Sequence, residues 1–461
     1  MPFRHKVLPR NSAPHCGAFS FEKSDTLATQ IRTFLTEGIM SAQLDLFSSV
    51  LHAYSKESDG VLDNQTLYTK AAETAGICEA DVNAKAVVDN SGQEHNLFKR
   101  KVRWYQQTLK HAGILERVEE KRGLWRLTTP ATKDLSKIQS GVAVVGFSTD
   151  LGIAILGSCD TVFASADAPV TLVVTSPPYP LASARKYGNP SEPEYVDWIC
   201  RTLEPVIKSL VPGGSICLNI SNDIFMPKSP ARSMYCERLL LALHDRFGLE
   251  LMDRLIWSNP SKAPGPYQYA SKDRTQLNVA YEPIYWLTND PQKVRSNNRR
   301  VLQEHTEKHL KLIHQGGEQR ESVFSDGAYR VTHGSFGAAT EGRIPRNILT
   351  YGHRCAAQLA YKKAAKALGL AVHGAPMPMK LASFLIEFLS EPGEVVADPF
   401  GGSFTTADAA ERLGRRWLST DCMAEYVLGG ATRFASAPGF VQHLTLDHLP
   451  AKKENMELIL V

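Results

Sequence analysis

The feature that most constrains the fold of this chain is an alternation of short apolar runs and amphipathic helices that begins near residue 140. Residues 171–174 and 215–220 are apolar runs with the length of buried strands. Between them, apolar residues recur at helical spacing, and a Pro-Gly-Gly turn at 212–214 ends the helix. Because strands that alternate with helices form parallel sheets, the sequence predicts a mostly parallel α/β sheet. Further strands are predicted at 251–257, 282–287, 394–398 and 416–421, and further helices around 239–247 and 381–389.

The first of these strands ends in the sequence Thr-Ser-Pro-Pro-Tyr at residues 175–179. Two consecutive prolines fix φ and provide no N–H donor, so this loop presents its carbonyl groups in a stiff frame. The Ser176 hydroxyl and the Pro177 carbonyl can accept the two N–H bonds of an exocyclic amine, while the Tyr179 ring stacks on its flat face. We therefore predict that Ser176, Pro177, Pro178 and Tyr179 are catalytic. Alternatively, the loop only ends the strand and has no catalytic role.

A second motif joins a strand to a helix at residues 397–406, which read Ala-Asp-Pro-Phe-Gly-Gly-Ser-Phe-Thr-Thr. Asp398 ends the strand, and a glycine pair lets the backbone approach a ligand closely. This arrangement is typical of a Rossmann-type cofactor loop, although the sequence is not G-x-G-x-x-G. Asp421 ends the next strand, where an acidic residue commonly holds ribose hydroxyl groups. Alternatively, the motif is only a tight turn that caps the helix and binds no cofactor.

The composition excludes several other classes of protein. No run of about 18 apolar residues is present, and no apolar core follows the basic N-terminus, so we expect neither a membrane span nor a secretory signal. The eight cysteines are scattered without a C-x-x-C pair, which argues against a disulfide framework or zinc ribbon and fits a cytoplasmic protein. No cluster of His, Asp and Glu has the spacing of metal ligands, so no metal is expected. A net charge of +4 permits a nucleic-acid partner.

Together, the two loops resemble those of the amino-methylating DNA methyltransferases. The catalytic loop precedes the cofactor loop, which is the circularly permuted motif order of the beta group. Flanking segments are also similar, since residues 157–160 resemble the family's G-D-C-L segment, 210–214 its L-x-P-G-G turn, 282–285 the strand before its recognition region and 373–378 its H-x-A-P-F-P segment. The resemblance covers about residues 150–430. The chain departs from the family pattern at Ser158 (usually Asp), Met377 (usually Phe) and Phe404 (usually Gly).

The resemblance implies a Rossmann-like sheet that binds S-adenosyl-L-methionine, and a double-stranded DNA substrate. Serine before Pro-Pro is typical of enzymes that methylate cytosine N4, by base flipping and direct in-line transfer. Two alternatives remain open: an adenine-N6 enzyme, and a DNA-binding protein with an inactive methyltransferase domain, for which Phe404 is the indication. The residues expected to hold the cofactor are Asp160, His373, Pro376, Asp398, Pro399, Phe400, Gly401, Gly402, Ser403, Thr405 and Asp421.

Residues 291–354 interrupt the α/β pattern with a polar segment that is too long for an ordinary connection. This segment contains eleven Lys or Arg, six Asp or Glu and five His residues. It stands where the family has its target-recognition region, so its arginines are expected to contact phosphates or guanine bases. A solvated surface excursion is the alternative. The arginines are Arg295, Arg299, Arg300, Arg320, Arg330, Arg343 and Arg346.

Residues 1–140 are expected to form a separate α+β domain, and residues 141–461 the catalytic domain. A basic helical stretch, a turn and two short strands resemble a winged-helix domain, in particular the N-terminal domains of some restriction-system proteins. Residues 99–126 contain nine basic and three acidic side chains, so Lys99, Arg100 and Arg103 are expected to contact DNA phosphates. A protein-interaction module is the alternative. The resemblance implies a restriction-modification system with a cognate endonuclease as partner, and a monomer or homodimer.

Overall fold

The computed structural model describes residues 46, 49–50, 52–54, 56–57, 60–87, 93–111, 115–118, 121, 123–127, 137–138, 141–166, 168–181 and 188–445. Its contacts divide the chain into a smaller unit within Ile39–Thr132 and a larger unit within Lys133–Thr445. The domain boundary predicted at residue 140 lies outside the described residues. No helix in the described ranges is long and apolar enough to cross a membrane.

The smaller unit combines short helices with a three-stranded antiparallel sheet in the order β1-β5-β4. Helix α5 buries Phe98, Val102 and Leu109, which recur at helical spacing, and exposes Arg100 and Arg103 on its other side. This apolar stripe of α5 packs in a core that also contains Leu67 of α3 and Trp125 of β5. Its elements are β1 (Val61–Asp63), α3 (Asn64–Thr74), α4 (Glu79–Asn83), β2 (Lys85–Val87), β3 (Glu94–Asn96), α5 (Leu97–His111), β4 (Leu115–Arg117) and β5 (Leu124–Leu127).

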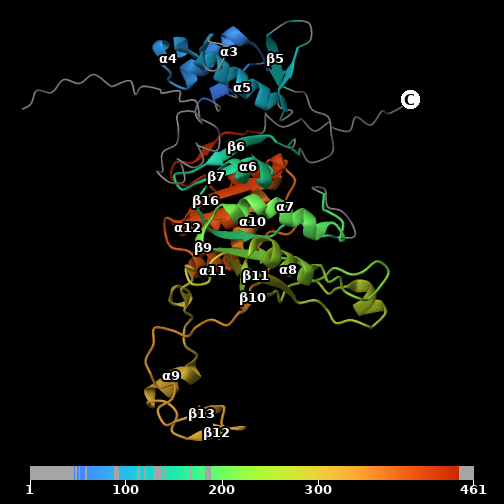
Figure 1. The fold of residues 1–461 in the computed structure, drawn as a ribbon, viewed down its shortest axis with the longest axis vertical. Coiled ribbons are helices and arrows are strands. Elements are labelled where there is room, and N and C mark those ends of the chain that lie inside the picture. The colour runs from blue at the N-terminus through green and yellow to red at the C-terminus, as the bar shows by residue number, and fades with distance from the viewer. Residues whose placement is uncertain are drawn as a thin grey trace, which may run out of the picture. The chain divides into compact units, whose positions relative to one another are not determined.

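The larger unit is built on a ten-stranded sheet in the order β14-β10-β11-β9-β8-β15-β16-β7-β6-β17 (Figure 1). Its centre, from β9 to β7, is parallel, whereas β11 and β6 run antiparallel to their neighbours. The predicted α/β fold and the strands named above are confirmed, although the sheet is mixed rather than mostly parallel, because β11, β6 and β17 pair antiparallel at its two sides. The strands are β6 (Ala143–Ser148), β7 (Gly152–Gly157), β8 (Val170–Thr175), β9 (Leu210–Asn219), β10 (Glu250–Ser258), β11 (Tyr281–Thr288), β14 (Ile348–Thr350), β15 (Val395–Asp398), β16 (Arg416–Asp421) and β17 (Val441–Gln442).

Amphipathic helices cover this sheet, and α6, α7 and α8 lie side by side, as do α11 and α12 (Figure 1). The stripe predicted on α7 is buried at Ile199, Leu203 and Val206. The turn predicted at 212–214 instead lies inside β9, because Gly213 adopts a φ of +81° and lets the strand continue irregularly. The helices are α6 (Cys159–Ala166), α7 (Tyr195–Lys208), α8 (Tyr235–Phe247), α10 (Ala356–Ala367), α11 (Met379–Leu389), α12 (Thr405–Arg412) and α13 (Ala424–Ala431).

Two segments project from the sheet. Residues 259–280, between β10 and β11, contain the short π-helix η1 (Tyr267–Lys272). The polar insert after β11 contains η2 (Asn298–Val301), α9 (Glu307–His314), β12 (Ser322–Phe324) and β13 (Tyr329–Val331). Backbone hydrogen bonds between Gln303 and Arg343 close the base of the insert, and its outer elements lie away from the sheet (Figure 1).

Candidate active site

The candidate site lies at the carboxyl edge of the parallel strands. Because β8, β9, β15 and β16 are parallel, the residues that end or follow them meet at one edge of the sheet. Strand β11 runs in the opposite direction, so its first residues, Tyr281 and Glu282, lie at the same edge. Ligands of open α/β sheets bind at this edge.

The Thr-Ser-Pro-Pro-Tyr loop is part of a hydrogen-bonded cluster of side chains. The Ser176 and Tyr179 hydroxyl oxygens are 2.8 Å apart, and the Tyr179 hydroxyl donates to Glu282 Oε2 at 3.3 Å. The Asn219 amide donates to Ser176 Oγ at 3.3 Å, Tyr179 Oη at 3.0 Å and Glu282 Oε2 at 3.1 Å. Lys262 Nζ donates to Glu282 Oε1 at 3.1 Å. Side chains from four separate segments therefore form the cluster, and two of them, Tyr179 and Asn219, contact the Ser176 hydroxyl directly.

One acceptor of the cluster is buried and has no hydrogen-bond partner among the described residues. A Glu282 carboxylate only accepts hydrogen bonds, so the Asn219 NH₂ group must face it. Asn219 is 2% exposed, and no described residue donates to its Oδ1. Burial, and then the charge of Glu282, raise the pKa of Tyr179 well above its ordinary value, so its phenol stays neutral. Ser176 Oγ, which is only half-buried, is thus an acceptor suited to an amine, whereas Asn219 Oδ1 is buried without a partner.

Sequence reasoning missed the roles of Asn219, Lys262 and Glu282 in this cluster. For two of them the available signal was their position at strand ends, since Asn219 lies near the end of the predicted strand 215–220 and Glu282 begins the strand predicted at 282–287. The direction of the second strand, which brings Glu282 to the site, is not evident from local sequence. In the loop itself, Pro177 is buried and Pro178 is half-buried, as expected of a stiff frame.

The second part of the site contains the two predicted acids. Asp398 Oδ1 accepts from the Thr175 hydroxyl at 2.7 Å and from the Phe400 N–H at 3.1 Å. Asp421 accepts from the N–H groups of Gly402 and Met423, each at 2.8 Å. Burial raises the pKa of each carboxyl group to about 6, although these hydrogen bonds act in the opposite direction. Both groups are therefore anionic at neutral pH and remain able to accept further hydrogen bonds.

The glycine pair of the cofactor loop fits closely against its neighbours. A Cβ atom on Gly401 would lie 2.5 Å from Ser419 Oγ, and one on Gly402 would lie 3.1 Å from His373 Nε2. Gly402 also has a φ of +51°, in the left-handed region. The structure thus brings His373 to the loop, as predicted, and its ring also packs edge-on against Tyr426 with centroids 5.0 Å apart.

Phe404 occupies the position where glycine was expected. It adopts the left-handed conformation, with a φ of +56° and a ψ of 34°, so the loop bends although glycine is absent. This conformation costs a residue with a Cβ roughly 1–2 kcal/mol. The ring is completely buried, with its centroid 5.4 Å from that of Phe147, and it packs against the bare backbone of Gly430. This burial offsets the cost. Phe404 is therefore compatible with a formed cofactor loop.

Ser403 and Thr405 face a buried network behind the loop, since each is 3% exposed. Arg433 donates to the Ser403 carbonyl at 2.6 Å and to Gln358 Oε1 at 2.6 Å, and Gln358 donates to Thr405 Oγ1 at 2.9 Å. Asp408 Oδ2 lies 3.2 Å from Arg433 Nη1 and forms a salt bridge with the buried guanidinium. These two loop residues therefore anchor the loop, and no sequence motif indicated Arg433.

The other predicted cofactor residues lie nearby. Pro376 and Pro399 are buried, and the Pro399 carbonyl accepts from the Thr420 hydroxyl at 2.9 Å. Phe400 packs on Trp198 with centroids 6.0 Å apart. Asp160 lies exposed in the first turn of α6, which follows β7 at the same sheet edge.

Comparison with known proteins identifies the family. Residues 170–431, more than half of the chain, match the DNA methylase family, and residues 45–137 match the Mrr N-terminal domain. This chain is a member of the DNA methylase family. The type II methyltransferase M.PvuII of Proteus hauseri is 34% identical over 58% of the methylase and 79% of the relative. The type II methyltransferase M.BglII of Bacillus subtilis is 23% identical over 57% of the methylase and 62% of the relative.

Among solved structures, the PvuII DNA methyltransferase, described as cytosine-N4-specific, is similar to the methylase with a TM-score of 0.48. It shares 30% sequence identity, and the match covers 63% of the methylase and 88% of that chain. The predicted resemblance to amino-methylating DNA methyltransferases is confirmed by the family match. The methyl donor of these enzymes is S-adenosyl-L-methionine. Within the described residues, the methylase has no group of three or more His, Cys, Asp or Glu side chains that could hold a metal ion.

The arginines predicted to contact DNA are dispersed in the methylase. Arg295 pairs with Glu394 at 3.4 Å and Arg300 with Glu391 at 3.2 Å, at the amino edge of the sheet. Arg299 is exposed beside them. These three residues thus lie at the edge opposite the Ser176 cluster, and two of them are engaged in ion pairs within the protein.

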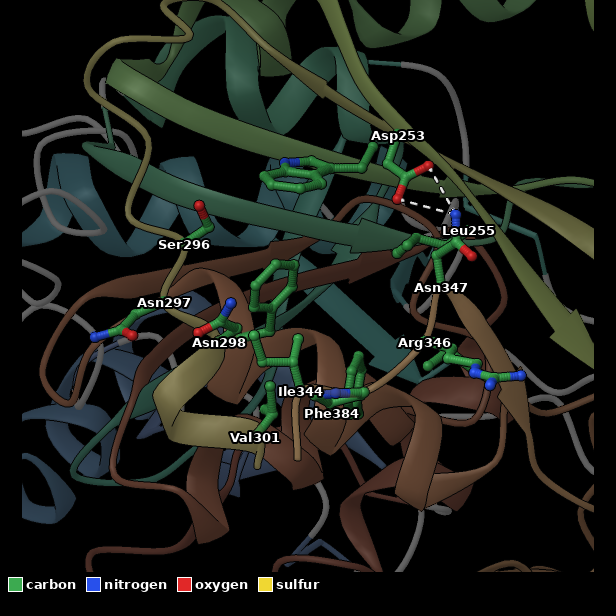
Figure 2. Close-up of a pocket in the computed structure, with 14 residues that line it drawn as sticks. Asp253, Leu255, Ser296, Asn297, Asn298, Val301, Ile344, Arg346, Asn347 and Phe384 are labelled. Carbon is green, nitrogen blue, oxygen red and sulfur yellow. Dashed lines mark hydrogen bonds between the residues drawn. The ribbon is translucent and has the colours of Figure 1, made fainter. Parts of the chain in front are cut away.

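The remaining basic residues lie farther along the chain. In the outer insert, Arg320 pairs with Glu318 at 3.4 Å and Arg330 is exposed on β13, while Arg343 closes the base. Arg346 lines a cavity of about 380 Å³ between the insert base, β10 and α11 (Figure 2). In the smaller unit, Lys99 Nζ lies 5.5 Å from the centre of the Tyr68 ring, and Arg100 and Arg103 are exposed on α5.

Proposed function

We propose that this methylase transfers a methyl group from S-adenosyl-L-methionine to the exocyclic N4 of cytosine in a specific duplex DNA sequence. The observation that carries the proposal is the Ser176 hydroxyl, held by Asn219 and Tyr179 at the same sheet edge as Asp398 and Asp421. The PvuII enzyme, which shares 34% identity with this chain, is described as cytosine-N4-specific. Serine before Pro-Pro supports the same acceptor.

The residues of the loop fit the cofactor. When bound, S-adenosyl-L-methionine supplies a methyl group on a positively charged sulfur. Asp398 and Asp421 provide negative charge at neighbouring strand ends, and Asp421 retains lone pairs for ribose hydroxyls. Gly401 and Gly402 give the backbone a smooth surface where a Cβ atom would intrude. His373, beside Gly402, would lie along the bound cofactor.

The mechanism depends on how the acceptors hold the amine. The lone pair of the cytosine amine is delocalised into the ring, which makes it a poor nucleophile. Ser176 Oγ and the Pro177 carbonyl accept its two hydrogens and favour a pyramidal nitrogen whose lone pair points away from the ring plane, while Asn219 and Tyr179 hold Ser176 in position. Alignment of this lone pair with the methyl group supplies much of the acceleration. Glu282 is the carboxylate of the cluster that takes up the proton lost after methylation, through the Tyr179 and Ser176 hydroxyls.

A base inside a stacked duplex cannot reach this edge of the sheet, so the target cytosine is flipped out of the helix. The Tyr179 hydroxyl is anchored by three partners, which holds the ring in one orientation. The flipped base stacks on this ring in place of its neighbours in the duplex.

The smaller unit serves DNA binding in this proposal. The order of its sheet and the position of α5 before the β4–β5 pair support a winged-helix domain, and we assign residues 1–140 to this domain and 141–461 to the catalytic domain. Arg100 and Arg103 on the open side of α5 contact phosphates. The relatives named type II methyltransferases support a role in restriction-modification with a cognate endonuclease. The enzyme acts in the cytoplasm, where the described cysteines stay free thiols.

The test compares two subtle variants of the cluster. Ser176→Ala should lower kcat by about 10- to 150-fold, because one amine acceptor worth roughly 1.5–3 kcal/mol in the transition state is lost. Tyr179→Phe keeps the ring and should cost less, whereas Tyr179→Ala should cost more. Ser191→Ala, which removes a surface hydroxyl bonded to Glu194, is the matched control. Wild-type rates for both Ser176→Ala and Tyr179→Ala would refute the assignment.

Adenine N6 is the second candidate acceptor. The DNA adenine methyltransferase YhdJ of Escherichia coli is also a relative, at 23% identity over 56% of this chain and 72% of that protein. Digestion of the methylated DNA to nucleosides separates the two products by mass and retention. N6-methyladenine as the labelled product would replace the cytosine assignment.

A further inference from the structure

The segment between β10 and β11, residues 259–280, is here called the flap. Because β10 ends and β11 begins at the carboxyl edge, the flap is rooted beside the Ser176 cluster. The Asn259 N–H donates to the Ala280 carbonyl at 2.9 Å and closes its base. Lys262 of the flap donates to Glu282, which in turn accepts from Tyr179. The flap is therefore connected to the catalytic loop by direct hydrogen bonds.

The flap is a structured element. The Tyr269 ring packs on Phe225 with centroids 5.1 Å apart, and Gln276 Nε2 donates to the Pro230 carbonyl at 3.2 Å. The Val279 N–H donates to the Gly265 carbonyl at 2.8 Å, and the Val279 side chain is only 8% exposed. These contacts fix the positions of the two residues between Gln276 and Val279, Leu277 and Asn278.

Leu277 is 87% exposed, although it lies between the anchored residues Gln276 and Val279. Two further apolar rings are exposed nearby in sequence, Tyr267 at 67% and Tyr281 at 43%. The intervening residues Lys272 and Arg274 are exposed and basic. A flap that carries an exposed leucine together with exposed rings and cations matches the chemistry of a DNA duplex, which has anionic phosphates outside and flat bases inside.

The polar insert joins the sheet at the edge opposite the flap. It leaves from the end of β11 and returns into β14, which is parallel to β10, so both of its ends lie at the amino edge of the sheet. In Figure 1 its outer elements, α9, β12 and β13, project in a different direction from the flap. The flap is thus the projecting segment whose root adjoins the reacting groups.

We propose that the flap contacts the DNA duplex at the target base pair and that Leu277 enters the base stack where the flipped base has left. This inference rests on the base flipping of the proposed function. Flipping opens an apolar gap between neighbouring base pairs, and an inserted apolar side chain stabilises the open duplex. Lys272 and Arg274 then lie near the flanking phosphates and keep the flap on the duplex.

The test uses the full-length protein and two duplexes that carry the target sequence, which is first read from DNA methylated by the wild type. In one duplex the target base is paired, and in the other it lies opposite an abasic site, so it needs little energy to leave the stack. Leu277→Ala should slow methylation of the paired duplex about tenfold, because the burial of the leucine side chain is lost. The rate on the abasic duplex should stay close to that of the wild type. Leu241→Ala, at a leucine that is 60% exposed on α8, is the matched control and should change neither rate.

Three outcomes would overturn the inference while the wild type remains active on DNA. They are equal rates for Leu277→Ala and the wild type, equal slowing on both duplexes, and slowing by Leu241→Ala as well. A photo-crosslinking side chain at position 277 gives a second readout that does not depend on the rate. It should form adducts with DNA, and adducts with a second copy of the chain instead would also overturn the inference. Absence of methylation by the wild type on any DNA would instead count against the proposed function.

Discussion

Replacing Glu282 by glutamine removes the charge that organises the Ser176 cluster while keeping the shape of the side chain. In the native protein the carboxylate accepts from Lys262, Asn219 and Tyr179, at 3.1, 3.1 and 3.3 Å. The glutamine amide has one acceptor oxygen, so its NH₂ group must face either the Lys262 ammonium or the Asn219 NH₂ group. Either arrangement places two donors against each other. The first breaks the bond from Lys262, and the second makes Asn219 turn away from Ser176.

The magnitude follows from the bonds that are lost. A hydrogen bond to a charged group contributes about 1.5–3 kcal/mol, and at least one such bond to the cluster is broken. If that free energy is lost only in the transition state, kcat falls by about 10- to 150-fold. The affinity for S-adenosyl-L-methionine should change little, because Asp398 and Asp421 belong to the other half of the site.

The assay measures the initial rate of methyl transfer at saturating DNA and S-adenosyl-L-methionine, with cofactor affinity measured separately by calorimetry. Glu391→Gln is the matched control, since Glu391 pairs with Arg300 at the amino edge and is 65% exposed. It should leave kcat unchanged. A kcat of Glu282→Gln within twofold of the wild type would refute the role given to this carboxylate.

Two further predictions concern the cofactor loop. Phe404→Ala and Phe404→Gly should both lower the free energy of unfolding, by about 3–5 kcal/mol for the alanine variant, because a buried ring is lost. The Phe404→Gly variant should be more stable than Phe404→Ala by about 1 kcal/mol, since glycine tolerates the left-handed backbone. Equal free energies of unfolding for the two variants in denaturant would contradict the backbone strain inferred at this position. The pKa values of Asp398 and Asp421 near 6 exceed the ordinary 3.8, so their contribution to stability is greatest at low pH and falls as pH rises from about 4 to 6. The affinity for the cofactor should rise as pH increases through about 6, because the carboxyl groups then become anionic. Calorimetry should show a shallower rise for Asp421→Asn, which has lost one of these groups.

The catalytic and cofactor loops could be predicted because each follows a buried strand. Parallel strands place the residues after their carboxyl ends at one edge, so Ser176, Asp398 and Asp421 come together by connectivity alone. Glu282 needed the direction of β11, which local sequence does not reveal. Lys262 comes to the site only because the flap folds back on the strand ends.

The basic residues show why composition is a weaker guide than connectivity. The excess of arginine in the insert predicts a nucleic-acid surface, yet Arg295 and Arg300 pair with acids that are far away in sequence, Glu394 and Glu391. Arg433 had no motif of its own, but its guanidinium holds the cofactor loop from behind. Such pairings depend on tertiary contacts between distant segments, so charge counts cannot anticipate them.

The central claim is tested most directly by incubating purified protein with labelled S-adenosyl-L-methionine and unmethylated duplex DNA of mixed sequence. The DNA is then digested to nucleosides, which are separated by retention and identified by mass. The account predicts label in N4-methylcytosine, with little label when Ser176→Ala replaces the wild type. Label confined to N6-methyladenine, or no label in DNA of any sequence, would contradict it.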